Sequence, residues 1–317
     1  MTKTKIQLFA LSAIAAATLA ACGSDNNATT ATTSASETTS IARLGTYNTG
    51  LFDESAAEIP AYDPVTQRLF VVNAQAGAID VLDLSDPQNP VLEQTLTTAA
   101  VLAGSVVNSV AVSNGLLAVA IEAPLKTDPG RVAIFDTDTL ALISSVTVGA
   151  QPDMVTFTPD GTKVLSANEG EPRDDYQIDP EGSISIVDVS NPGAPVVRTA
   201  SFTAFNSQAA ALRTAGVRIY GPGATVAQDL EPEYISVSAD GRTAWVTLQE
   251  NNALAKVDIA SATVTDVLPL GYKDHGVAGN ELDVSDRDNT INIRTWAGVR
   301  GMYQPDAMAS YTAGGQT

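Results

Sequence analysis

Four copies of one short segment recur along this chain, and their spacing limits the folds open to it. The copies are GAIDVLD (77–83), GRVAIFD (130–136), GSISIVD (182–188) and NALAKVD (252–258). Each has an aspartate six residues after a glycine or asparagine, and each follows two apolar runs divided by turn residues such as Pro159-Asp160-Gly161. Such turns join antiparallel strands. Short strands repeating every roughly 45–80 residues are typical of β-propeller blades.

We therefore predict an all-β chain with four propeller blades of four strands each. A fifth blade should begin at residues 304–308, and residues 41–47 resemble an outer strand that would complete a last blade. The chain thus resembles the N-terminal part of a longer propeller, which we expect to have seven blades. A β-sandwich would also suit alternating strands, but it does not explain the repeat. Neither Trp245 nor Trp296 is followed by aspartate, so this is not the WD-repeat class.

Several long stretches resemble the choice-of-anchor I family. They are AEIPAYDPVTQRLFVVNA, PDMVTFTPDGTKVLSANEGEPRDDY, GPGATVAQDLEPEYISVS, TAWVTLQENNALAKVDIASATVTD and INIRTWAGVRGMYQPDAMASY. The resemblance runs from about Ile41 to the last residue. It implies a bacterial, surface-exposed propeller similar to the extracellular part of mesenchyme-specific cell-surface glycoproteins. Members normally continue well past this length, so it also implies a C-terminal truncation. Some relatives carry phosphatase-like or phytase-like labels.

The first 21 residues have the layout of a secretory signal peptide. Lys3 and Lys5 precede an apolar stretch, residues 6–21, that is too short to span a bilayer. The sequence LAAC, ending at Cys22, resembles a bacterial lipoprotein box, in which the cysteine is acylated. An ordinary cleaved signal with a chance cysteine is the alternative.

We accordingly predict a lipid anchor at Cys22, a flexible Ser/Thr-rich stalk to residue 40, and a partial propeller domain over 41–317. Gly23, rather than aspartate, follows the cysteine. By the sorting rule of lipoproteins, this favours the outer membrane of a Gram-negative cell envelope.

Carboxylates are placed where the predicted blades begin. The first strand of each blade is innermost, so polar residues at its start should ring the mouth of the central channel: Glu58, Asn108, Asp153, Glu233 and Asp306. We expect Glu169, Asp229 and Glu231 close by. Such carboxylates raise one another's pKa unless a cation neutralises them, and oxygen ligands suit calcium or magnesium. The alternative is that they accept hydrogen bonds from exposed backbone amides of neighbouring blades.

The loops on the same face carry further charged residues. The members of this predicted ligand face are Arg173, Asp174, Lys273, Asp274 and His275. In the loop 169–181 we expect Asp174, Asp175 and Asp179 to be solvated at the tip. The repeated aspartates should instead accept hydrogen bonds in turns on the opposite face. The acidic segment 281–292 lacks the glycine and glutamate of an EF-hand. It could bind a metal ion, or Arg287 and Arg294 could neutralise it instead.

The residue counts exclude several kinds of chemistry. His275 is the only histidine and Cys22 the only cysteine, which excludes multi-histidine zinc sites and haem-attachment motifs. Gly221-Pro222-Gly223 lacks the lysine and further glycines of a nucleotide-binding loop. The formal net charge of −19 disfavours nucleic acid and favours cations and basic surfaces.

Two functions remain. We predict a lipid-anchored, non-enzymatic module that binds a protein, glycan, small molecule or calcium through its acidic loop face. The alternative is a calcium-dependent phosphoester hydrolase resembling propeller phytases, with the channel-mouth carboxylates as ligands and Lys273 or Arg173 holding phosphate. We prefer binding, because basic residues that could gather a polyanion are sparse there. Open inter-blade surfaces also predict self-association of the isolated chain.

Overall fold

The structure is a computed structural model that describes residues 40–53, 56–315 and 317. The chain divides into two units, Met1–Ala42 and Arg43–Thr317. The residues of the first unit that are described, 40–42, have no regular secondary structure. The signal peptide, Cys22 and nearly all of the stalk lie outside the described residues.

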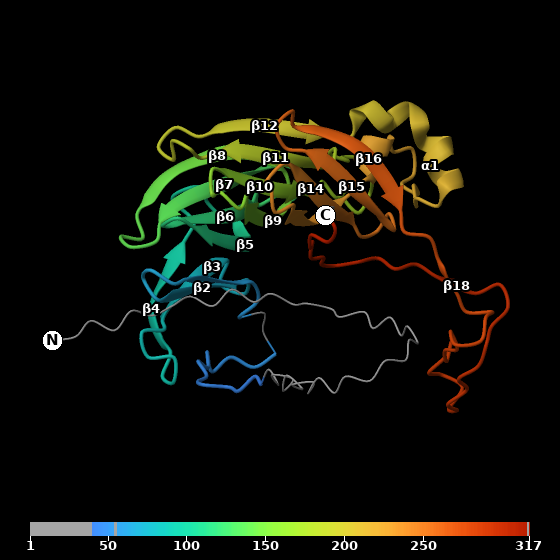
Figure 1. Ribbon diagram of the computed structural model, residues 1–317, viewed down its shortest axis with the longest axis horizontal. Coiled ribbons are helices and arrows are strands. Elements are labelled where there is room, and N and C mark those ends of the chain that lie inside the picture. The colour runs from blue at the N-terminus through green and yellow to red at the C-terminus, as the bar shows by residue number, and fades with distance from the viewer. Residues whose placement is uncertain (1–39, 54–55, 316) are drawn as a thin grey trace, which may run out of the picture. The chain divides into compact units, whose positions relative to one another are not determined.

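The second unit contains four antiparallel sheets of four strands, each ordered as its strands follow in the chain (Figure 1). The first is β1 (Pro60–Asp63), β2 (Arg68–Asn73), β3 (Ala78–Asp83) and β4 (Val91–Thr97). The second is β5 (Val106–Ser113), β6 (Leu116–Glu122), β7 (Pro129–Asp136) and β8 (Leu142–Ala150). The third is β9 (Pro152–Phe157), β10 (Lys163–Asn168), β11 (Ser183–Asp188) and β12 (Val196–Ser201). The fourth is β13 (Pro232–Val237), β14 (Thr243–Leu248), β15 (Ala253–Asp258) and β16 (Thr263–Pro269).

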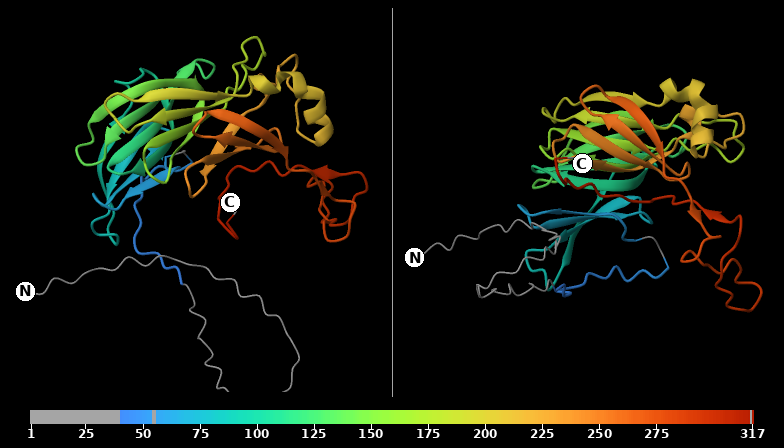
Figure 2. Two further views of the ribbon diagram at one scale, coloured as in Figure 1. Left: turned by 45° about the horizontal axis from the view of Figure 1, so that its top comes forward. Right: turned by 45° about the vertical axis from the view of Figure 1, so that its right-hand side comes forward.

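These sheets confirm the predicted propeller blades. The repeated segments form β3, β7, β11 and β15, the third strand of each sheet. The innermost strands β1, β5, β9 and β13 each contact the next one along the chain. Figure 2 shows the sheets following one another within this unit.

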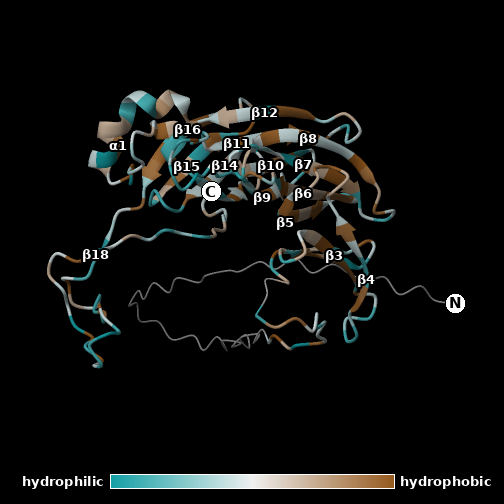
Figure 3. Cartoon of the chain, turned by 180° about the vertical axis from the view of Figure 1, so that it is seen from behind, coloured by the Kyte–Doolittle hydropathy of each residue, from teal (hydrophilic) through white to brown (hydrophobic). Residues whose placement is uncertain are grey.

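The core lies between the blades, and strand alternation builds it. In β6, Leu117, Val119 and Ile121 pack into the cluster shared with the first blade. Ala118 and Ala120, on the opposite side of the same strand, pack against the third blade. Side chains alternate between the faces of a strand, so one apolar run supplies two inter-blade cores. Figure 3 shows the resulting apolar strands, while the loop leading to β18 (Arg300–Gly301) is largely hydrophilic.

The insertion 203–231 is not only a projecting loop, as the sequence suggested. It forms the 3-10 helix η1 (Thr203–Gln208), α1 (Ala209–Ala215) and α2 (Val226–Asp229). Its residues Phe205, Leu212 and Leu230 are buried in the core between the third and fourth blades. These helices were not predicted because elements of one or two turns are too short to show a helical period.

The two ends of the second unit lie against the outer blades without forming strands. Residues 41–47, expected to be a strand, have no strand partner among the described residues. Near the C-terminus, β17 (Lys273–Asp274) pairs with β18. The segment expected to begin a fifth blade, residues 304–308, follows the fourth blade in the chain. Shortly after it, Ser310 N donates a hydrogen bond to Ser236 Oγ on β13 at 2.9 Å. It is not a strand in the described chain.

Candidate functional site

Irregular pairing in the innermost strands sets the direction of the side chains that form the site. In the second and third blades, Asn108 and Asp153 are extra residues with no partner opposite them in the adjacent strand. In the fourth blade, the register shifts between Pro232 and Ile235, the stretch that contains Glu233. Such bulges turn a side chain out of the regular pleat. The three polar residues therefore have the same structural origin in successive blades.

Contacts between glycine and proline fix the start of these strands. A Cβ on Gly182 would lie 1.9 Å from the Leu230 carbonyl oxygen and 2.8 Å from Pro232 Cδ. A Cβ on Gly130 would lie 2.4 Å from Pro152 Cδ. The repeated glycine thus lets one blade approach the proline of the next. The acid that follows each proline, Asp153 or Glu233, is positioned by this contact.

The predicted ring residues line one cavity of about 560 Å³. They are Glu58, Asn108, Asp153, Glu233 and Asp306. Asn108 Nδ2 donates to Glu122 Oε2 at 3.0 Å and to the Pro152 carbonyl at 3.2 Å, so it links the second and third blades. Glu58 and Asp306 are exposed at this cavity.

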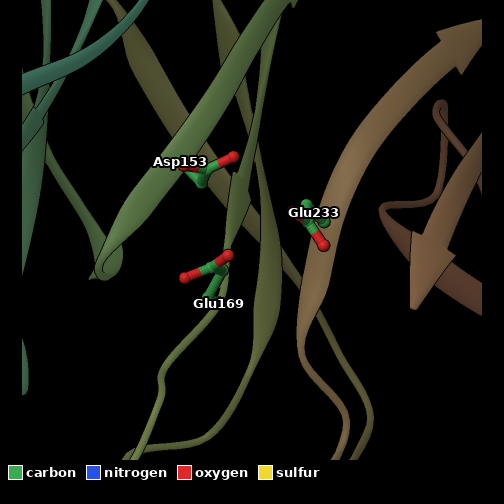
Figure 4. A group of neighbouring side chains, drawn as sticks. All are labelled: Asp153, Glu169 and Glu233. Carbon is green, nitrogen blue, oxygen red and sulfur yellow. The ribbon is translucent and has the colours of Figure 1, made fainter. Parts of the chain in front are cut away.

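Three carboxylates converge most closely. One oxygen each of Asp153, Glu169 and Glu233 lies within 4.8 Å of the others. Asp153 is on β9, Glu169 directly follows β10, and Glu233 is on β13, so the group spans two blades. Figure 4 shows the three side chains extending into a common space. This is an all-oxygen donor set of the kind that calcium prefers.

Burial and mutual repulsion raise the pKa of every member of this group. Burial raises the pKa of Glu169 to about 9, and the charges of Asp153 and Glu171 add to the effect. Burial, followed by Glu250 and Asp153, raises the pKa of Glu233 to about 8. Burial and the nearby Asp306 raise that of Asp153 to about 6. A cation bound between the three carboxylates would oppose all three shifts.

The structure adds three residues that sequence reasoning missed: Gln151, Glu171 and Lys126. Gln151 has a φ of 50°, unusual for a residue other than glycine, and its Nε2 donates to both Glu169 and Glu171. Although burial opposes it, hydrogen bonds from Lys126 and Gln151 lower the pKa of Glu171. Lys126 Nζ lies 2.8 Å from Glu171 Oε2. The only sequence signal was the place of Gln151 before Pro152, at the start of a blade.

Asp229 and Glu231, expected near the ring, have different surroundings. Both oxygens of the buried Asp229 accept backbone hydrogen bonds, from Tyr220 N at 2.8 Å and from Gly221 N. Asp229 therefore holds the Gly221-Pro222-Gly223 turn. Glu231 is also buried, and burial and the nearby Glu250 raise its pKa to about 8.

The residues of the predicted ligand face do not form one site. Arg173 pairs with Asp175 at the exposed loop tip, and Asp174 is exposed beside them. Asp179 is not solvated as predicted, because its Oδ1 is buried and has no hydrogen-bond partner among the described residues. Gln228 Nε2, on α2, donates to the Asp179 carbonyl at 2.8 Å.

Lys273, Asp274 and His275 lie on or beside β17, away from the lining of the carboxylate cavity. His275 Nδ1 lies 2.6 Å from the Asn280 carbonyl oxygen, and Asp274 Oδ1 accepts from Gly276 N at 2.9 Å. These contacts shape the local loop.

The remaining aspartates accept hydrogen bonds in turns. Asp83, Asp136, Asp188 and Asp258 each accept a backbone N–H from two or three residues further on, as predicted for the repeat. In the segment 281–292, Asp283 accepts from Ser285 N and Asn292 N. The two carboxylate oxygens of Asp283 therefore connect the beginning and the end of this loop.

Comparison with solved structures gives distant similarities. A chain of a nidogen/laminin complex matches at 14% identity and a TM-score of 0.41, over 68% of this chain and 65% of that one. A functionally unknown protein from Desulfotomaculum acetoxidans matches at 10% identity and a TM-score of 0.49, over 73% and 62%. A Lactobacillus plantarum protein matches at 16% identity and a TM-score of 0.46, over 69% and 60%. This chain spans less than two thirds of each of them.

Two further findings concern relatives and the membrane. No curated protein matches this sequence. None of the helices in the described ranges combines the length and apolarity needed to cross a bilayer.

A family model gives the clearest relationship. The model of the choice-of-anchor I domain matches residues 58–317, which include all four blades and every carboxylate of the cavity. This agrees with the family resemblance stated from the sequence. The chain belongs to the choice-of-anchor I domain family.

Proposed function

We propose that this protein is a lipid-anchored module of the cell envelope that binds calcium at the channel mouth and presents the surrounding loop face to a ligand. The family and the propeller fold suggest a surface binding module. The main support for a calcium site is the convergence of Asp153, Glu169 and Glu233 from two blades. Their raised pKa values reflect a repulsion that a divalent cation would relieve.

The donor set fits calcium better than a transition metal. Calcium takes about six to eight oxygen ligands with flexible geometry, and carboxylates are its usual protein donors. The three clustered side chains would supply the central ligands, and Glu58 and Asp306 line the same cavity as Asp153 and Glu233. Because the ligands come from the third and fourth blades, an ion there would hold these blades together.

Calcium titration followed by thermal unfolding tests this proposal. Calcium at about one hundred times its Kd should raise the free energy of unfolding by about 2.7 kcal/mol. Asp153→Asn or Glu233→Gln should remove most of that gain. The matched control is Glu281→Gln, an exposed acid on the loop between β17 and β18, which should keep it. An unchanged melting temperature in calcium would refute the site.

We favour a binding function over hydrolysis because lysine and arginine do not occur among the residues lining this cavity. A phosphoester needs such groups to balance its charge. Incubation with a simple phosphomonoester and with phytate, in calcium, separates the two functions. We expect no turnover, whereas turnover that disappears in Asp153→Asn would establish the hydrolase.

The lipid anchor and outer-membrane location are supported by the LAAC sequence and by Gly23. Mass spectrometry of the mature N-terminal peptide should find an acylated Cys22. Cys22→Ala should lose the modification, and an unmodified Cys22 in the wild type would contradict the anchor.

A further inference from the structure

A second, smaller acidic pocket lies beside the calcium site. Its volume is about 190 Å³, and it is lined by Glu171, Pro172, Arg173, Asp174, Tyr176, Tyr220, Glu231 and Glu250. These residues come from separate places in the chain: the loop after β10, the insertion before β13 and the turn after β14. The pocket is therefore built by the third and fourth blades together with the insertion.

Glu231 is the unusual member of this pocket. The residue is only 6% exposed, yet its carboxylate has no hydrogen bond or ion pair with any described residue. Its backbone N–H, by contrast, donates a hydrogen bond to Asn251 Oδ1 at 3.1 Å. A buried carboxylate without a partner is costly. Here it faces a pocket rather than packed protein, which is the arrangement expected of a group that receives a ligand.

The nearby basic side chains are engaged elsewhere. Lys126 pairs with Glu171 at 2.8 Å. Arg173, which itself lines the pocket, pairs with Asp175 at the loop tip. Arg218 stacks on Tyr220, 3.6 Å from the ring centroid, and donates to the Glu250 carbonyl at 3.1 Å. None of these three basic side chains forms an ion pair with Glu231.

The geometry of the pocket disfavours a bare metal ion. Among the described residues, the only group of three carboxylates with oxygens within 4.8 Å of one another is Asp153, Glu169 and Glu233. Glu171, Glu231 and Glu250 are too widely spread to share one small ion. A larger cation could reach them by separate hydrogen bonds, and its alkyl stem could lie against Tyr176 and Tyr220, which are partly exposed.

We propose that this pocket binds an organic cation: the ammonium or guanidinium end of a flexible chain, carried by a free polyamine or by a basic side chain of a protein partner. Glu231 is the buried counter-charge, and Glu250 and Glu171 are acceptors at the rim. With its amide nitrogen turned toward the acids, Gln249 lies 3.1 Å from Glu250 Oε1 and 3.2 Å from Glu233 Oε2, which links the pocket to the calcium site. The proposal does not depend on calcium binding.

Isothermal titration calorimetry of the full chain tests the pocket with spermidine, agmatine and a short lysine- and arginine-containing peptide. We expect saturable binding of at least one probe, weakened roughly tenfold or more by Glu231→Gln. Glu281→Gln is the control and should bind like the wild type. If the small amines bind as tightly as the peptide, the pocket takes free amines, and a peptide-only response indicates a protein partner.

A second variant separates this site from the calcium site. Asp153→Asn should lose calcium binding and keep the organic cation, while Glu231→Gln should do the reverse. Because glutamine matches glutamate in shape and removes a buried charge, Glu231→Gln should fold, which its melting curve checks. The proposal is overturned if none of the probes binds, if Glu231→Gln binds them as well as the wild type, or if Glu231→Gln instead lowers the calcium stoichiometry.

Discussion

Asp153, Glu169 and Glu233 lie so close together that ionising all three carboxylates costs free energy. Their ordinary pKa values are 3.8 for the aspartate and 4.5 for the glutamates, and in the folded protein they rise to about 6, 9 and 8. Between the ordinary and the raised values the folded protein holds more protons than the unfolded chain. Stability without metal should therefore fall as the pH rises from about 4 to about 9, by up to about 1.4 kcal/mol per pH unit for each proton. Urea unfolding across this range measures the slope, and calcium should flatten it. A slope of the opposite sign would contradict the raised pKa values.

Glu169 provides the sharper test at the residue scale. Glu169→Gln removes the carboxylate with the highest pKa, so we expect the metal-free protein at about pH 8 to become more stable, by more than about 1 kcal/mol. The same change should reduce the stabilisation by calcium. Glu281→Gln should alter neither quantity. A variant that is less stable without metal would show that Glu169 is held by favourable hydrogen bonds, of which that from Gln151 is the candidate.

The sequence predicted part of this site, for a physical reason. Asp153 and Glu233 could be placed because each follows a proline at the start of a repeated strand, and the position of Glu169 follows from strand parity. Gln151 and Glu250 were missed, because their role depends on loop contacts between blades that no period encodes. That Glu231 lines a second pocket with Glu171 and Glu250 could not be predicted, for the same reason.

At the scale of elements, the repeated glycine joins one blade to the next. Gly182→Ala would bring a methyl group within 1.9 Å of the Leu230 carbonyl, so the start of β13 must shift. We expect a loss of stability of about 1–3 kcal/mol and weaker calcium binding, because Glu233 moves with that strand. Gly193→Ala is the control, since the nearest atom to its Cβ would be Asn191 Oδ1 at 3.7 Å. Thermal unfolding with and without calcium measures both effects. Equal stabilities of the two variants would show that the contact is not needed.

The strands were predictable and the insertion was not. Strands such as β6 and β11 carry apolar residues on both faces and recur with fixed turns, so pattern and period both identify them. The helices of 203–231 are short, and Phe205 and Leu212 are buried by contact with the fourth blade. Their structure follows from tertiary packing, which overrides local sequence preference.

At the scale of the whole molecule, the outer side of the first blade determines how the isolated chain should behave in solution. In β2, Phe70 and Val72 are fully buried toward the second blade, while Leu69 and Val71 line a cavity of about 470 Å³ on the other side with residues 43–47. Among the described residues, no further sheet packs on this largely apolar side as it does on the inner blades, so we expect self-association. Light scattering after size exclusion should show oligomers that increase with salt, because salt screens the repulsion of a net charge of −19. Val71→Lys should shift the chain toward monomer, while the exposed Val65→Lys should not. A monodisperse monomer at all salt concentrations would instead mean that the described residues before β1, such as 43–47, cover this side well enough.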